Sequence, residues 1–179
     1  MTFDKINDKL YAVREDGQED NVLYHLFDQW NDTNYLYGFF KNHIDTLNNY
    51  FHIDSIKQAV TDTLEDAAYL EDVLIDLNVD NLNTIFKHLS LEDSNVMFLS
   101  RHKARNWNRS NHNSWLRIYA LKLEDGIYII TGGAIKMTKK MQDDIITEEQ
   151  LNKINNCKRF LKHEQICDVP GFEELINTI

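Results

Sequence analysis

The spacing of apolar residues changes along the chain from the helical to the strand period, and this change constrains the fold most. Over about 19–90, apolar residues recur three or four positions apart, as on one face of a helix. Over about 96–137 the dominant pattern is alternation, as in half-buried strands. Because helices and strands are segregated along the chain, the pattern predicts an α+β fold.

The first half predicts one strand followed by a helical block. The strand covers 9–15 and ends at the turn signal Asp16-Gly17. Helices are expected over 22–30 and 36–51, then from a cap at Asp54 or Ser55 as far as 77, and finally a short one capped by Asp80 over 82–89. The carboxylates of the third helix lie largely off its apolar face, which predicts a solvated acidic surface: Asp62, Glu65, Asp66, Glu71 and Asp72.

The second half predicts a meander of three strands and a closing helix. The strands are expected over 96–105, 115–123 and 127–131, with a hairpin turn at 124–126. Gly132-Gly133 follows the third strand, where a bulge or a close backbone approach is expected. Thr147 and Gln150 form a capping box for a helix that ends before Pro170. The resulting fold is a small antiparallel sheet with the helical block between its first two strands.

Length and composition predict one globular domain, 1–179, with an acidic helical insertion at about 19–90 and a sheet core at about 96–162. Hydrophobic residues make up 42% of the 179 positions, and there is a single proline. No apolar run approaches the ~20 residues of a membrane span, and the N-terminal residues lack the pattern of a secretory signal. We therefore expect a cytoplasmic protein without membrane contact. Neither Cys157 nor Cys167 lies in a metal or redox motif, so reduced structural thiols are expected.

Charge is distributed unevenly along the sequence. The net charge of −10 divides into −13 over 1–100 (6 basic, 19 acidic), +7 over 101–140 (9 basic, 2 acidic) and −4 over 141–179 (4 basic, 8 acidic). A concentrated basic segment can bind phosphate locally in a protein that is acidic overall. The region 101–140 is therefore where a nucleic-acid site is expected.

Alternation on the second meander strand places Trp115, Arg117 and Tyr119 on one face. If the helices cover the opposite face, these three side chains lie on an open sheet surface that suits stacked bases and phosphates. The alternative is that the two aromatic side chains belong to the core.

Cations surround the end of the third strand. Lys136, Lys139 and Lys140 follow the glycine pair, at the edge from which four further cations could approach: Arg101, Lys103, Arg105 and Arg109. Such a cluster would stabilise the charge on a phosphorus centre during phosphodiester cleavage, or would simply form a solvated basic face. His102 and His112 are the histidines nearest to it, and His112 in the linker is either a proton-transfer group or incidental. We expect no metal, no cofactor and no nucleotide triphosphatase, because ligand spacing and a Gly-x-x-x-x-Gly-Lys loop are both lacking.

Three short motifs resemble the RelE/HigB-type toxins of bacterial toxin–antitoxin systems. They are Arg117-Ile118-Tyr119, the stretch GAIKMT at 133–138, and the helix that begins near Thr147, so the resemblance covers about 96–162 and, by topology, the first strand. The chain departs from that family at Ala134, Met137 and Gln142, in its longer helical block and in its acidic composition.

The resemblance implies a metal-independent RNA endonuclease that acts on messenger RNA at the ribosome and is paired with a cognate antitoxin. The 2′-hydroxyl would attack the adjacent phosphorus and leave a cyclic phosphate. By position, Arg117 and Lys136 would hold the phosphate and stabilise the transition state, and His112 or Tyr119 would transfer a proton. The expected RNA contacts are Arg101, Lys103, Arg105, Arg109, Trp115, Lys139 and Lys140.

Two other functions are compatible with the sequence. One is a non-catalytic binding module in which the acidic N-terminal part lies against the basic segment and occludes it. The other is an interaction protein whose aromatic-rich helices bind a partner and whose sheet is only a scaffold.

Overall fold

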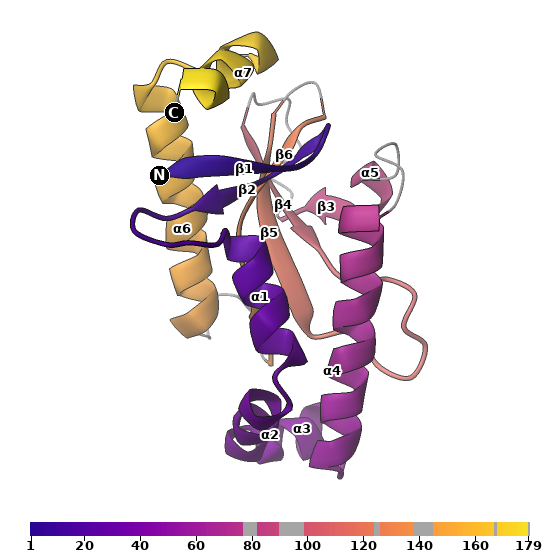
Figure 1. The fold of residues 1–179 in the computed structure, drawn as a ribbon. Helices are drawn as coiled ribbons and strands as arrows, with labels where there is room; N and C mark the ends of the chain where they lie inside the picture. Colours follow the sequence, from indigo (N-terminus) through magenta and orange to yellow (C-terminus); the bar gives the residue numbers. More distant parts are fainter. Residues whose placement is uncertain (77–81, 90–98, 124–125, 138–144, 167, 179) are drawn as a thin grey trace.

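A six-stranded mixed sheet with the order β1-β2-β6-β5-β4-β3 runs through the centre of the molecule, and helices cover both of its faces (Figure 1). The computed structural model describes residues 1–76, 82–89, 99–123, 126–137, 145–166 and 168–178. The α+β class is confirmed. The strands are β1 (Thr2–Asn7), β2 (Leu10–Arg14), β3 (Phe86–His88), β4 (Ser100–Ala104), β5 (Leu116–Lys122) and β6 (Tyr128–Ile135).

The sheet is larger than the predicted one and is not purely antiparallel. Strands β1 and β3 were not predicted, and β2, the predicted first strand, pairs in parallel with β6. The remaining neighbours are antiparallel, as the meander pattern indicates. β6 continues through the glycine pair, and the expected bulge lies opposite Tyr119 and Ala120, where the register with β5 shifts.

The helical block between β2 and β3 begins with four helices: α1 (Val22–Asn31), α2 (Thr33–Asn42), α3 (Ile44–Phe51) and α4 (Ile56–Glu71). The Ser55 hydroxyl accepts a hydrogen bond from the Gln58 amide, so the predicted cap of α4 is confirmed. The single helix predicted over 36–51 is wrong, because the backbone leaves the helical region at His43 and separates α2 from α3.

The fourth predicted helix, over 82–89, is confirmed only over its first turn. After α4 the chain continues in the π-helical turn η1 (Asp72–Asp76), and α5 (Leu82–Ile85) is a single turn that leads directly into β3. Pairing of β3 with β4 overrides the helical spacing of the apolar residues there. The proposed cap at Asp80 lies outside the described residues.

Two helices close the chain, α6 (Ile145–His163) and α7 (Val169–Thr178), of which α7 was not predicted. Thr147 lies inside α6 and not at its start, so the capping box is wrong. None of the helices within the described ranges is long and apolar enough to cross a membrane.

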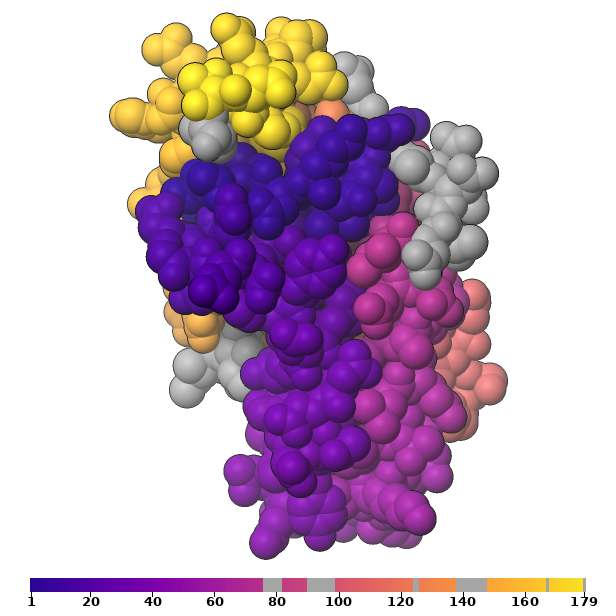
Figure 2. Space-filling model, in the orientation of Figure 1, coloured from indigo at the N-terminus to yellow at the C-terminus, as the bar shows by residue number. Residues whose placement is uncertain are grey.

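Two hydrophobic cores lie on opposite faces of the sheet. One joins β5 and β6 to the helices α1, α2 and α4, and this helical side forms much of the surface seen in Figure 2. The other joins the same strands to α6 and α7 through Ile154, Cys157, Leu161 and Phe172. The expectation of an open sheet face is therefore wrong. Tyr119 is 1% exposed under α6, and Trp115 is completely buried on the helical-block side.

Candidate anion-binding site

Three strand termini meet at one end of the sheet and bring three cations together. Because β4, β5 and β6 are antiparallel neighbours, the end of β4, the start of β5 and the end of β6 lie side by side. Arg105, Arg117 and Lys136 lie at these termini and line a pocket of about 200 Å³. We call this the anion pocket. Its other lining residues are Tyr50, Phe51, Asn113 and Ser114.

Arg117 lies at the base of the anion pocket. Its Nη1 donates hydrogen bonds to the carbonyl oxygens of Ser114 at 2.5 Å and Leu116 at 2.7 Å, which fixes the guanidinium. Burial, and to a smaller extent the charge of Arg105, lower the pKa of Arg117 to about 10. A guanidinium whose charge is disfavoured in this way would be stabilised by an incoming anion.

Lys103 and Arg105 extend the same positive region. Burial lowers the pKa of both side chains, and the neighbouring charges of Arg117 and Arg105 lower that of Lys103 further. Arg105 also stacks on the Trp107 ring, with 4.1 Å between its Cζ atom and the ring centroid. Burial thus disfavours the charged form of both side chains, and at Lys103 the two neighbouring positive charges add to this effect.

Two polar atoms of the anion pocket are buried without a hydrogen-bond partner in the described part of the chain. They are Arg105 Nε and Ser114 Oγ. Ser114 as a whole is 1% exposed, so bulk water does not substitute for the missing partner. Both groups can donate to an oxygen, and an anion in the pocket would accept both hydrogen bonds.

Lys136 completes the lining at the end of β6. Its backbone amide donates to the Trp115 carbonyl at 2.8 Å, which continues the ladder between β5 and β6 past their termini. Arg117, Lys136 and Arg105, three of the cations that the sequence singled out, thus line one pocket. Arg101 lies further along β4, opposite Leu121, and does not line the pocket. Lys139 and Lys140 lie outside the described residues.

Arg109 is engaged elsewhere, in a buried cluster with α4. Its guanidinium contacts three carboxylates, at 3.2 Å for Asp62, 3.1 Å for Glu65 and 2.8 Å for Asp66. Asp62 and Asp66 are buried, so the expected solvated acidic surface is wrong for these two residues. The reason is that the loop before β5 covers this face of α4 and supplies the compensating charge. Arg109 is therefore not an RNA contact in this arrangement.

His112 belongs to the same cluster. Its Nε2 lies 2.7 Å from Asp62 Oδ2, its Nδ1 lies 3.0 Å from the Asn113 carbonyl oxygen, and its ring stacks on Trp115 with a centroid distance of 4.3 Å. Both ring nitrogens are thus engaged, by Asp62 and by the backbone of Asn113, and His112 does not line the anion pocket, so proton transfer by His112 is not supported. Trp115 in turn donates to Thr63 Oγ1 at 2.9 Å, as a core residue does.

Sequence reasoning missed the residues that complete the anion pocket. Ser114 and Asn113 precede β5 in a polar linker with no motif, although their position two or three residues before a basic strand could have drawn attention to them. Tyr50 and Phe51 come from α3, in the insertion that was treated separately from the basic segment. No signal in the sequence relates α3 to this end of the sheet.

Comparison of the chain with protein-family models, with curated proteins and with solved structures finds no match. The site is a small pocket at three strand termini, lined by three cations and by two buried donors that have no partner among the described residues, an arrangement that suits an anion.

Proposed function

We propose that this protein binds RNA with a phosphate in the anion pocket and cleaves it as a toxin-like endonuclease. The observation that carries the proposal is the convergence of Arg105, Arg117 and Lys136 around the Ser114 hydroxyl, which has no hydrogen-bond partner among the described residues. The resemblance of 96–162 to RelE/HigB-type toxins supports the same choice of substrate, and by that resemblance the RNA would be messenger RNA at the ribosome. A cognate antitoxin would then be the natural protein partner.

The proposed reaction needs charge stabilisation more than covalent chemistry by the protein. The 2′-oxygen bonds to phosphorus and releases its proton to water, while the bond from phosphorus to the 5′-oxygen breaks and a cyclic phosphate remains. Arg117 and Arg105 offset the charge that accumulates on the non-bridging oxygens. The Lys136 ammonium is the lining group suited to donate a proton to the departing 5′-oxygen.

A second candidate function is RNA binding without cleavage. No histidine or carboxylate is among the described residues that line the anion pocket, and Asp62 holds His112 away from it. The acidic insertion meets the basic segment at Arg109 and His112, so occlusion of the cations at the pocket itself has no support among these contacts. The two functions share the phosphate site and differ in whether a product forms.

The test uses the purified full chain and a fluorescein-labelled single-stranded RNA at low salt. Binding is measured by anisotropy and cleavage on denaturing gels, with mass spectrometry to detect a terminal cyclic phosphate. Arg117→Ala and Lys136→Ala should abolish cleavage, whereas Lys162→Ala, an exposed residue in the last turn of α6, should leave it unchanged.

The outcomes separate the candidates. Cleavage that depends on Arg117 and Lys136 supports the nuclease, and binding that depends on them without any product supports the binding module. Absence of binding by the wild-type chain at low salt rejects both, because a phosphate site should bind RNA most tightly there.

A further inference from the structure

We propose that a second, larger cavity is a binding site for a small organic cation such as an amine or guanidinium compound. This cavity of about 440 Å³ lies between α1, α2 and α6, against the last residues of β6. Its volume falls in the range typical of small-molecule sites. The proposal concerns a different ligand from the anion pocket and does not depend on RNA binding.

The cavity lies beyond the point where β2 stops pairing with β6, although β2 itself continues to Arg14. On the edge of β6 that faces away from β5, only Tyr128, Ile129 and Ile130 pair with β2. Residues 132–135 of β6 line the cavity and have no described strand beside them on that side. Backbone carbonyls along such an edge are available to accept hydrogen bonds from a ligand.

A buried acceptor in the lining needs a donor. Gln150 on α6 is 6% exposed, and its Oε1 has no hydrogen-bond partner in the described part of the chain. This oxygen lies over Gly132, which has no Cβ atom and so leaves room for the amide. A buried oxygen in this position favours a ligand that carries N–H groups.

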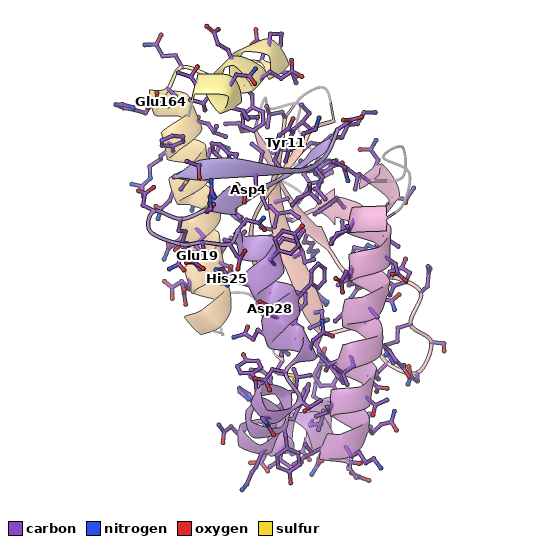
Figure 3. All side chains as sticks on the ribbon, viewed as in Figure 1. Asp4, Tyr11, Glu19, His25, Asp28 and Glu164 are labelled. Atoms are coloured by element: carbon purple, nitrogen blue, oxygen red, sulfur yellow. The ribbon has the colours of Figure 1, made fainter. Side chains whose placement is uncertain are left out.

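Charge around the cavity has the opposite sign to that of the anion pocket. Its described lining holds three carboxylates, Glu15, Asp20 and Glu149, against one ammonium, Lys153. Lys153 lies 3.7 Å from both Glu15 and Glu149 and therefore offsets only part of their charge. Figure 3 shows His25 on α1 and Glu19 in the loop before it, in the region between α1 and α6. A positively charged ligand is the complement of this rim.

Aromatic residues supply the apolar part of the site. Tyr35 and Phe39 line the cavity from α2, with their ring centroids 6.3 Å apart. Aromatic faces attract organic cations and also cover short aliphatic stems. Acceptors, carboxylates and rings together suit a short diamine or an alkyl guanidine.

Agmatine is the probe, because it carries a guanidinium and an ammonium on a short chain. Binding is measured by isothermal titration calorimetry and by amide shifts of Gly132, Gly133 and the Gln150 side chain in ¹H–¹⁵N spectra. Gln150→Leu should weaken binding about tenfold or more, because the buried acceptor is lost. Asp20→Asn and Glu149→Gln change exposed residues and should each weaken it up to about fivefold.

Glu174→Gln on α7, an exposed carboxylate outside the cavity, is the matched control and should bind agmatine like the wild type. Hexanoate, an anion of similar length, should not bind. The proposal is overturned if millimolar agmatine leaves the three signals unmoved, if hexanoate binds equally, or if Glu174→Gln weakens binding as much as Asp20→Asn. The exposed variants keep the test valid should Gln150→Leu fail to fold.

Discussion

Arg109 Nε donates a hydrogen bond to Asp66 Oδ1 at 2.8 Å, and the Asp66 side chain is completely buried. The contact joins the loop before β5 to the middle of α4. A carboxylate without access to water depends on such a partner, because an isolated buried charge is strongly unfavourable. The loop that carries Ser114 is thereby held against the helical block.

Removal of this guanidinium should be strongly destabilising. We expect Arg109→Met to lower the free energy of unfolding by about 3–5 kcal/mol, because Asp66 and Asp62 lose their compensating charge. Glu65→Gln is the matched control, since this carboxylate contacts the same guanidinium but is 64% exposed, and its loss should cost at most about 1 kcal/mol. Urea denaturation measures both values, and equal losses would contradict the dominance of the buried pairs.

Gly133, the second residue of the glycine pair, tests how closely β6 packs against β5 and α1. A Cβ atom at Gly133 would lie 2.6 Å from the Arg117 carbonyl oxygen and 2.7 Å from Leu26 Cδ1, so Gly133→Ala should destabilise the protein by about 1–3 kcal/mol. Gly38 on α2 has nothing within 4 Å, and Gly38→Ala should instead stabilise it by about 1 kcal/mol through helix propensity. Thermal unfolding followed by circular dichroism compares them, and changes of the same sign would refute the argument.

Some local features could be predicted from the sequence, whereas the long-range contacts that bury residues could not. Periodicity predicts the α+β class, and cap chemistry predicts the Ser55 cap. The antiparallel strand directions place Arg117 and Lys136 at the same end of the sheet. The burial of Tyr119 depends on where α6 lies, and the burial of Asp66 depends on an arginine 43 residues away. The spacing of residues along the chain predicts neither of these two long-range contacts.

The pKa of Arg117 predicts how anion binding depends on pH. Burial and Arg105 lower it to about 10, and an anion binds the protonated form. Affinity for a 2′-O-methyl RNA, which lacks the attacking hydroxyl, should therefore be high at pH 7–8 and fall as the pH rises through about 10. Anisotropy titrations at constant ionic strength measure the fall. Arg117→Ala should bind more weakly at neutral pH and lose part of this dependence, and an unchanged profile would argue against Arg117 as the phosphate ligand.

Cys157 should be unreactive in the folded protein. It is completely buried under the sheet, and burial raises the pKa of its thiol to about 12, so almost no thiolate forms near neutrality. In a Cys167→Ser background, Ellman's reagent should react with Cys157 only after denaturation in urea. Adding Lys162→Cys, at an exposed position of α6, gives a positive control that reacts at once. Rapid reaction of native Cys157 would contradict its burial between α6 and the sheet.

The parallel pairing of β2 with β6 has a consequence for synthesis of the protein. Leu10 aligns with Tyr128, so the N-terminal hairpin finds its neighbour only after most of the chain has left the ribosome. Until then, β2 can pair only with β1. Bringing β2 and β6 together also has an entropic cost, because the chain segment between them is long. The nascent hairpin is thus exposed to chaperones and to aggregation until β6 is complete.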